Sequence, residues 1–214
     1  MPKDTTKTPE SPPAEQVLQI PLELIHLFEG HPFKVMDDEL MQQTIDSIAQ
    51  YGVLNPVIVR PDGDGYEMVS GHRRLRASEL AGNDTIPAIS RNMRYDEAII
   101  FMVDSNLQRE SLLPSERAFA YRMKMDALKH QGKQLESTSR QLGEKLATSV
   151  SIVANDAGQS ERQVQRFIRL TELIPELLDM VDRRELAFNP AVELSYLIKP
   201  EQRMFIEAIV FRFQ

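Results

Sequence analysis

Three arginines stand near the start of a predicted helix, directly after a glycine. The segment covers residues 70–82, and its arginines are Arg73, Arg74 and Arg76. The N-terminus of a helix is electropositive, so it favours acidic side chains and disfavours a cluster of cations. A bound anion would relieve this conflict, because free backbone N–H groups and guanidinium groups both bind phosphate. The segment is therefore a candidate phosphate-binding site.

The arginines have a second interpretation, in which no ligand is involved. They form a solvated face, or they pair with carboxylates from elsewhere in the fold, as short basic runs commonly do. A strand-like run at 66–69 precedes Gly71, and Gly82 is a suitable stop for the helix. This order of strand, glycine and helix favours phosphate binding, and both interpretations stay open at this point.

The elements that must position this helix form a small α/β domain over residues 16–95. A helix opens at Asp37 and Asp38 and stops near Gly52, with Leu40, Ile45 and Ile48 facing inward. Residues 17–25 are predicted to form a short strand followed by a turn. Further strands are predicted at 56–60, 66–69 and 85–89, the first two of these around a Pro-Asp-Gly-Asp-Gly turn.

Composition excludes several classes of protein. The 214 residues are 42% hydrophobic, which is typical of a globular chain. The absence of cysteine excludes disulfides, thiolate zinc sites and cysteine nucleophiles. No apolar run is long enough to span a membrane, so we expect a cytoplasmic protein without a membrane partner.

The charge of the chain is unevenly distributed. The net charge is −7, and residues 1–50 hold three lysines against nine acids. The remainder is close to neutral and can present basic patches to a polyanion. A nucleic acid partner is therefore compatible with the acidic total.

Beyond the α/β domain the sequence becomes helical. Residues 1–15 are rich in Pro, Thr and charged residues and are predicted to be a disordered tail. Residues 96–132 are predicted to be connecting helices, the second starting at Pro114, and 131–139 to be a polar connection. Residues 133–214 are assigned to a second, all-helical domain.

Within that domain, residues 148–173 have the pattern of a helix–turn–helix. A helix at 149–157 is followed by Gly158 and by a second helix capped by Ser160. Arginine and glutamine side chains bind phosphates and base edges, and the polar residues that project here are Gln159, Ser160, Arg162, Gln163 and Arg166. A helical hairpin with no role in DNA binding is the alternative.

Together, the two parts resemble the ParB-type partition proteins over about residues 17–200. In that family a G-[EH]-R-R-x-R-A motif is matched here by GHRRLRA at 71–77. A G-V-L-x-P motif is matched by GVLNP at 52–56, and an E-N-[LI]-Q-R-x-x-L motif by SNLQRESL at 105–112. The resemblance implies an α+β fold, with a ParB/sulfiredoxin-like α/β domain followed by a helix–turn–helix domain.

The resemblance also implies a ligand and a set of site residues. The ligand is CTP with Mg, and the phosphate-binding residues are Gly52, Asn55, Gly71, His72, Arg73 and Arg74. Asn106 helps to place the metal, and the third motif adds Ser105, Gln108 and Arg109. A single asparagine is chemically sufficient for Mg when phosphates and water supply the other ligands.

The function that the resemblance implies is a switch in DNA segregation. CTP closes a dimeric clamp at a centromere-like double-stranded DNA site, and weak DNA-stimulated CTP hydrolysis permits release. The implied partners are DNA, a second copy of the chain and a ParA-type ATPase, and the implied location is the nucleoid or a plasmid.

The chain departs from the family pattern at several places. Ser105 replaces a glutamate that assists hydrolysis, which implies slow or absent turnover. His72 replaces a common glutamate, and a core or hydrogen-bonding role is expected for it rather than metal binding. HPFK at 31–34 is only a loose match to the P-x-Q-P-R segment that selects the base. The family's C-terminal dimerisation domain is not matched, so self-association is expected to rest on the N-terminal part.

Three other functions compete with this interpretation. A sulfiredoxin-type reductase needs a catalytic cysteine, which the chain does not have. A small-molecule kinase on the same fold is disfavoured by the helix–turn–helix. A DNA-binding transcriptional regulator whose α/β domain uses no nucleotide remains the alternative.

Overall fold

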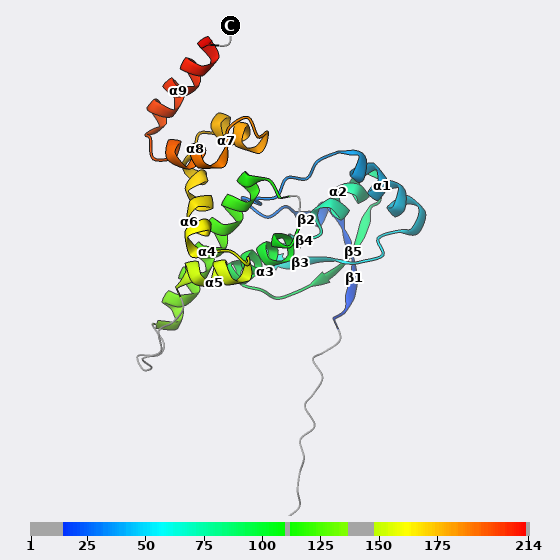
Figure 1. The fold of residues 1–214 in the computed structure, drawn as a ribbon. Helices are drawn as coiled ribbons and strands as arrows, with labels where there is room; N and C mark the ends of the chain where they lie inside the picture. The colour runs from blue at the N-terminus through cyan, green and yellow to red at the C-terminus, as the bar shows by residue number, and fades with distance from the viewer. Residues whose placement is uncertain (1–14, 110–111, 137–147, 213–214) are drawn as a thin grey trace, which may run out of the picture.

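The fold consists of a five-stranded sheet with its helices, followed by a group of helices beside it (Figure 1). The structure is a computed structural model, and it describes residues 15–109, 112–136 and 148–212. The strands are β1 (Val17–Pro21), β2 (Ile25–His26), β3 (Val57–Asp62), β4 (Gly65–Ser70) and β5 (Thr85–Ser90). The helices that accompany them are α1 (Glu39–Tyr51), α2 (His72–Leu80) and α3 (Tyr95–Leu107).

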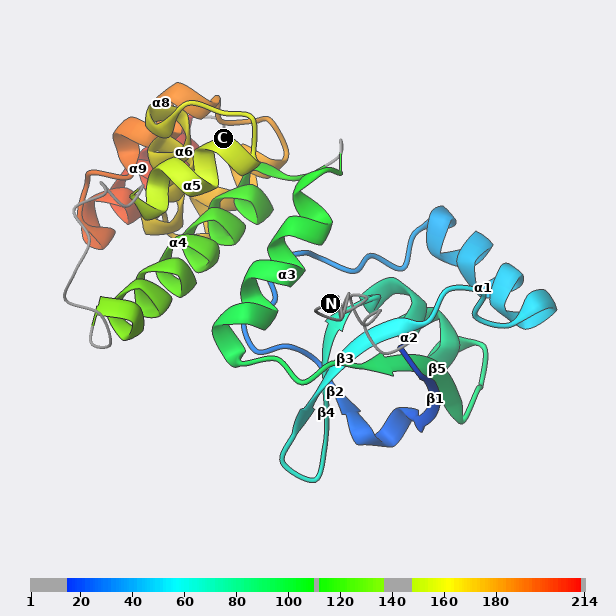
Figure 2. The ribbon, with the colours of Figure 1, turned by 90° about the horizontal axis from the view of Figure 1, so that it is seen from below.

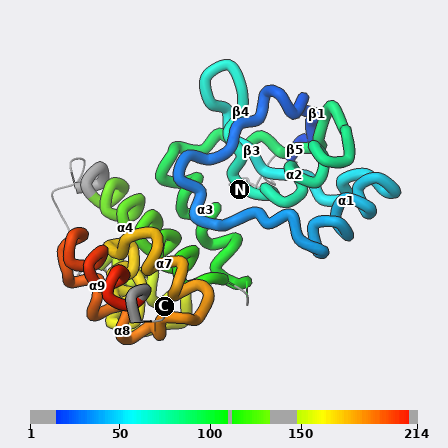
Figure 3. The backbone as a smooth tube through the Cα atoms, turned by 90° about the horizontal axis from the view of Figure 1, so that it is seen from above, coloured from blue at the N-terminus to red at the C-terminus, as the bar shows by residue number. Residues whose placement is uncertain are grey.

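The second group of helices follows α3. Its members are α4 (Pro114–Glu136), α5 (Ser149–Asp156), α6 (Glu161–Arg169), α7 (Pro175–Asp182), α8 (Phe188–Leu194) and α9 (Lys199–Arg212). Figure 3 shows these helices gathered beside the sheet part of the molecule. Within the described residues, no helix is long and apolar enough to cross a membrane. The predicted α+β fold is confirmed.

The strand order of the sheet is β1-β5-β3-β4-β2. The β3–β4 hairpin and the β1–β5 pair are antiparallel, whereas β5 pairs with β3 and β2 pairs with β4 in parallel. Successive side chains of a strand point to opposite faces. On β4, Met68 packs in the cluster that includes Leu75 of α2, and Val69 packs in the cluster that includes Met102 of α3. Helices α2 and α3 therefore cover opposite faces of the sheet.

Helix α1 begins and ends where its local signals predict. The Asp38 carboxylate caps it by accepting a 2.9 Å hydrogen bond from the backbone N–H of Met41, and Gly52 ends it with a φ of +71°. The expected inward position of Leu40 is wrong, because Leu40 is 62% exposed. Ile48 is buried as predicted and Met41 is the other buried residue, since the side of α1 that packs on Ala77 of α2 decides which residues are covered.

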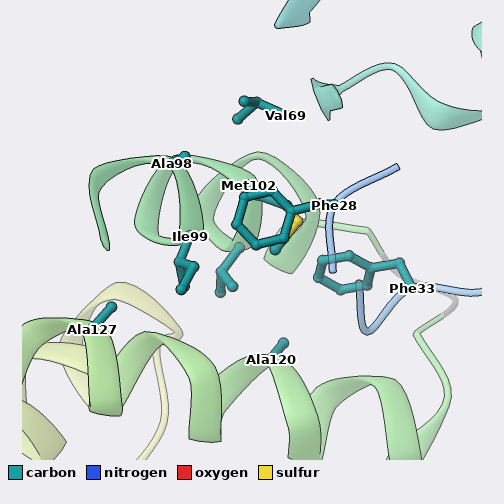
Figure 4. Packing of buried hydrophobic residues seen from close by; sticks show 9 residues of the cluster. Phe28, Phe33, Val69, Ala98, Ile99, Met102, Ala120 and Ala127 are labelled. Carbon is teal, nitrogen blue, oxygen red and sulfur yellow. The ribbon is translucent and has the colours of Figure 1, made fainter. Parts of the chain in front are cut away.

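Helix α3 lies between the sheet and α4 (Figure 2). Its buried side chains Ala98, Ile99, Met102 and Val103 share one core with Val69 of the sheet and with Ala120 and Ala127 of α4. Phe28 and Phe33, from the loop after β2, complete this core (Figure 4). The sheet and the second group of helices are thus joined through α3.

Where helix ends were predicted in the second group, at the start of α4 and around the turn between α5 and α6, the structure agrees, but α4 ends later than predicted. Thr148 caps α5 and Ser160 caps α6, and Gly158 lies in the turn between them with a φ of +61°. Val153, Ala154 and Val164 of this pair form a core with Tyr121 of α4. The polar connection predicted at 131–139 is wrong over 131–136, where α4 continues, and 137–139 lies outside the described residues.

The loop after β2 is fixed to α2 by two stacked histidines. The ring centroids of His31 and His72 lie 3.6 Å apart, and the Nε2 atoms of both rings are buried without a hydrogen-bond partner. Burial lowers the pKa of His31 to about 4 and the pKa of His72 to about 3. Both rings are neutral at pH 7, and His72 has the core role expected from its sequence context.

We expect acid to destabilise the protein through this pair. Between pH 7 and pH 5 the unfolded histidines take up protons at their ordinary pKa of about 6.5, whereas the stacked rings stay neutral. The free energy of unfolding therefore decreases as the pH is lowered, by about 2 kcal/mol for each ring between pH 7 and pH 5. Urea unfolding at the two pH values measures the loss, which we expect to shrink in the double variant His31→Phe/His72→Phe. The exposed His130 supplies the control, His130→Gln, and an undiminished loss in the double variant would contradict this account.

Candidate nucleotide and DNA sites

The junction between β4 and α2 requires a glycine. Gly71 has a φ of +112°, and a Cβ added there would lie 2.6 Å from Cγ1 of Val57 and 3.1 Å from Nη2 of Arg74. Only glycine fits both the backbone angle and the space. Helix α2 has no side-chain cap at this end, so the N–H groups of its first turn are not satisfied by a neighbouring side chain.

Two neighbouring cavities open beside this helix end. The first has a volume of about 300 Å³ and is lined by residues that include Gly71 and His72 of the second motif and Ser105 and Asn106 of the third. The second has a volume of about 480 Å³ and is lined in part by Gly52 and Asn55 of the first motif. Both cavities share Arg73, Arg74 and Arg109. The structure therefore brings together all the predicted nucleotide-site residues except Gln108, which lines neither cavity.

The arginines of α2 differ in what they contact. Arg74 donates to the backbone oxygens of Asn55 and Pro56 at 2.5 and 2.8 Å, so it fastens the 52–56 segment to α2, and burial lowers the pKa of Arg74. Arg73 donates to the Asp38 carboxylate at 3.1 Å. The ion pair of Arg73 with Asp38 is what the interpretation without a ligand predicts. Arg73 and Arg74 nevertheless both line the two cavities, so the phosphate-binding interpretation also stays open.

Arg76 does not belong to this site. Its guanidinium pairs with Asp37 at 2.9 Å and with Glu79 at 3.4 Å, and it lines neither of the two cavities. Hydrogen bonding to Arg76 holds the pKa of Asp37 below its ordinary value. For Arg76, therefore, the ion-pair interpretation of the arginine cluster describes the structure.

Arg109 and Asn106 meet at the last turn of α3. Asn106 donates to the backbone oxygen of Met102 at 2.9 Å, and its Oδ1 accepts from Arg109 at 3.3 Å. Among the described residues, Arg109 contacts this neutral amide and forms no ion pair. Within the described part of the chain, an anionic ligand could therefore engage Arg109 without displacing a carboxylate.

Five residues that line the smaller cavity were not among the predicted site residues: His31, Phe33, Lys34, Val35 and Ser70. Lys34 stands in the HPFK segment, whose loose match to the family motif was the available signal. Its ammonium lies 3.4 Å from Asp182 of α7, and its backbone N–H donates to Glu116 of α4 at 2.7 Å. The loop that lines the cavity thus also contacts the second group of helices.

The predicted DNA-binding residues lie in the turn before α6 and along this helix, with Arg166 in its last turn. Gln159 and Arg162 are exposed, while the hydroxyl of Ser160 caps the helix by accepting from the N–H of Gln163 at 3.2 Å. Arg166 lies over the ring of Phe188 at 5.0 Å. Arg162 and Arg166 also line, with Arg169, a cavity of about 530 Å³ between α6 and α8. This edge of the helix is basic and accessible.

Comparison with known proteins identifies relatives of both parts. Residues 6–107 match the model of the ParB N-terminal domain family. The chain is 35% identical over 189 residues to the chromosome-partitioning protein Spo0J of Thermus thermophilus, an alignment that covers 88% of this chain and 63% of the relative. It is 40% identical over 149 residues to the stage 0 sporulation protein J of Bacillus subtilis, covering 69% of this chain and 47% of that protein.

The fold also has a match among solved structures. It is similar to the C-terminally truncated chromosome-partitioning protein ParB from Caulobacter crescentus, complexed to the centromeric parS site, with a TM-score of 0.52 and 23% identity. That match covers 89% of this chain and 92% of the solved one, and at this identity it bears on the fold alone. The chain spans about half to two thirds of the length of the two curated relatives. With the matched domain and these relatives, the chain belongs to the family of ParB-type partition proteins.

Proposed function

We propose that this chain is a site-specific DNA-binding partition protein that acts as a nucleotide-dependent clamp in DNA segregation. The observation that carries the proposal is the convergence of three motifs, distant in sequence, on two cavities that share Arg73, Arg74 and Arg109. The relatives are named as chromosome-partitioning proteins, and the Caulobacter relative is complexed to a centromeric site. These names support the DNA-segregation role of the chain.

The residues at the cavities fit a nucleoside triphosphate. Gly71 lines the smaller cavity beside the uncapped start of α2, and three guanidinium groups border the space. Arg109 and Arg73 would contact phosphates, whereas Arg74 would keep the 52–56 segment in place through its backbone contacts. The family resemblance of the motifs makes CTP the proposed nucleotide.

Asn106 is the residue that would hold Mg, whose charge would offset that of the triphosphate. Its Oδ1 is a neutral oxygen that accepts from Arg109 at 3.3 Å, so Arg109 would have to turn to a phosphate when Mg binds this oxygen, and the phosphates and water would supply the remaining ligands. Ser105, in the place of the family glutamate, donates to the backbone oxygen of Met102 at 2.9 Å. Asp104 instead contacts Lys124 and lines neither cavity. We therefore propose that hydrolysis is slow or absent and that nucleotide binding itself is the switch.

DNA binding is assigned to α6 and the turn before it. Gln159, Arg162, Gln163 and Arg166 would contact base edges and phosphates in the major groove, and Ser160 would hold the helix start in shape. Closure of the clamp would need a second copy of the chain. A ParA-type ATPase is the remaining proposed partner.

The alternative is a DNA-binding regulator that uses no nucleotide. The observation in its favour is that Arg73 and Arg76 already pair with Asp38 and Asp37. The two functions differ in whether the affinity for DNA responds to a nucleotide.

Arg73→Ala should weaken CTP binding at least tenfold, because a charge-assisted hydrogen bond to phosphate contributes about 1.5–3 kcal/mol. Calorimetric titration of CTP, ATP, GTP and UTP with Mg measures both the affinity and the choice of base. Arg76→Ala is the matched control on the same helix, since Arg76 lines neither cavity, and it should bind CTP like the wild type. Absence of nucleotide binding by the wild type, or an equal loss in both variants, would favour the regulator.

Arg162→Ala should weaken specific DNA binding by about 1–3 kcal/mol if a base contact is lost. Fluorescence anisotropy measures this effect with a duplex that the wild-type protein selects from a random-sequence pool. Arg203→Ala, at an exposed position of α9, is the control and should leave the affinity within about twofold. If both variants bind the duplex with the same affinity, α6 is not the helix that contacts the base edges.

A further inference from the structure

A buried lysine joins three helices of the molecule. Lys124 lies in the middle of α4, and its side chain is only 1% exposed. Its Nζ donates to the carboxylate of Asp104 on α3 and, at 2.5 Å, to the carboxylate of Asp156 on α5. Both carboxylates are half-exposed, so the lysine is the buried member of the group.

We call the contacts Asp104–Lys124–Asp156 the lysine link, and its Asp104 end lies beside the nucleotide cavities. Asp104 is in the last turn of α3, directly before Ser105 and Asn106, which line the smaller cavity. Leu107 of the same turn packs against the core under the sheet and also against the core of the α5–α6 pair. A single helical turn thus contacts the cavity, the buried lysine and the helix pair.

The other end stands at the turn before the DNA-binding helix. Asp156 is the last residue of α5, and Gly158 and the Ser160 cap of α6 follow it. Holding Asp156 against α4 therefore fixes the start of α6 relative to α3 and α4.

The lysine makes this arrangement sensitive to small displacements. A buried ammonium group is unfavourable unless it is paired, and removal of one partner leaves part of its charge uncompensated. If a ligand moves the last turn of α3, Asp104 moves with it, and the balance of contacts at Lys124 changes. Asp156 is then the carboxylate left to pair with the ammonium group of Lys124, so its own position changes in turn.

We propose that Lys124 is a positioning residue that couples the nucleotide cavities to the DNA-binding helix pair, through Asp104 on one side and Asp156 on the other. The inference rests on the proposed function, and it names the groups that carry the coupling. Coupling between two sites is a free energy, and it appears as the factor by which one ligand changes the affinity for the other.

The experiment measures the dissociation constant of CTP, with Mg, in the absence and in the presence of the selected DNA duplex. For the wild type we expect the two constants to differ by a factor of about 5–150. In Lys124→Met and in Asp156→Asn the factor should fall to within about twofold of unity. Binding of CTP alone should stay within a few-fold of the wild type, because neither residue lines the cavities.

Lys129→Met is the matched control on the same helix. Lys129 is 52% exposed and lies 3.7 Å from Asp126, so this variant removes an ion pair of α4 outside the link and should keep the wild-type factor. Should Lys124→Met not fold, Asp104→Asn and Asp156→Asn carry the same test, since both carboxylates are half-exposed.

The outcomes separate the two proposals. If Lys124→Met and Asp156→Asn keep the wild-type ratio of the two CTP dissociation constants, the role of Lys124 is overturned and the proposed function stays intact. A wild type that binds DNA but not CTP, or whose constants do not differ, overturns the nucleotide switch and the coupling with it. If DNA no longer changes the affinity for CTP in Lys124→Met and Asp156→Asn but still changes it in Lys129→Met, the proposal is supported.

Discussion

The burial of α3 on two sides is the constraint on which the rest of the structure depends. One side of the helix packs on the sheet through Val69, and the other packs on α4 through Ala120 and Ala127. A helix enclosed in this way cannot move without disturbing one of its partners, because protein interiors are close-packed. Its last turn carries Asn106 to the smaller cavity and Leu107 to the core of the α5–α6 pair. The position of α3 therefore decides the geometry of both candidate sites.

Electrostatic competition decides how an anion would bind. Arg74 donates to backbone oxygens and Arg73 to the Asp38 carboxylate, while Arg109 donates to a neutral amide and forms no ion pair among the described residues. A phosphate would engage Arg109 directly and would compete with Asp38 for Arg73. Lys34, shared between the smaller cavity and Asp182, is subject to the same kind of competition. Ligand binding in this region would thus redistribute ion pairs that now stabilise the protein without ligand.

Local signals in the sequence predicted the elements well, and tertiary contacts account for what they missed. Asp38 and Gly52 mark the ends of α1 because capping acts within a few residues. Leu40 was misplaced because the neighbouring helix chooses the buried face. The approach of 52–56, 71–77 and 105–109 was expected only from the family resemblance, since no local rule relates segments so far apart. The pairing of Arg76 with Asp37 and the burial of Lys124 depend likewise on contacts between distant elements.

If the three motifs bind one ligand, that ligand protects all three segments at once. Hydrogen–deuterium exchange of the whole chain, with and without CTP and Mg, measures this protection, with ATP and Mg as the comparison. We expect CTP to slow exchange together at 52–56, 71–77 and 105–109, and ATP to do so less. Exchange that CTP leaves unchanged in these segments, or slows in only one of them, would contradict it.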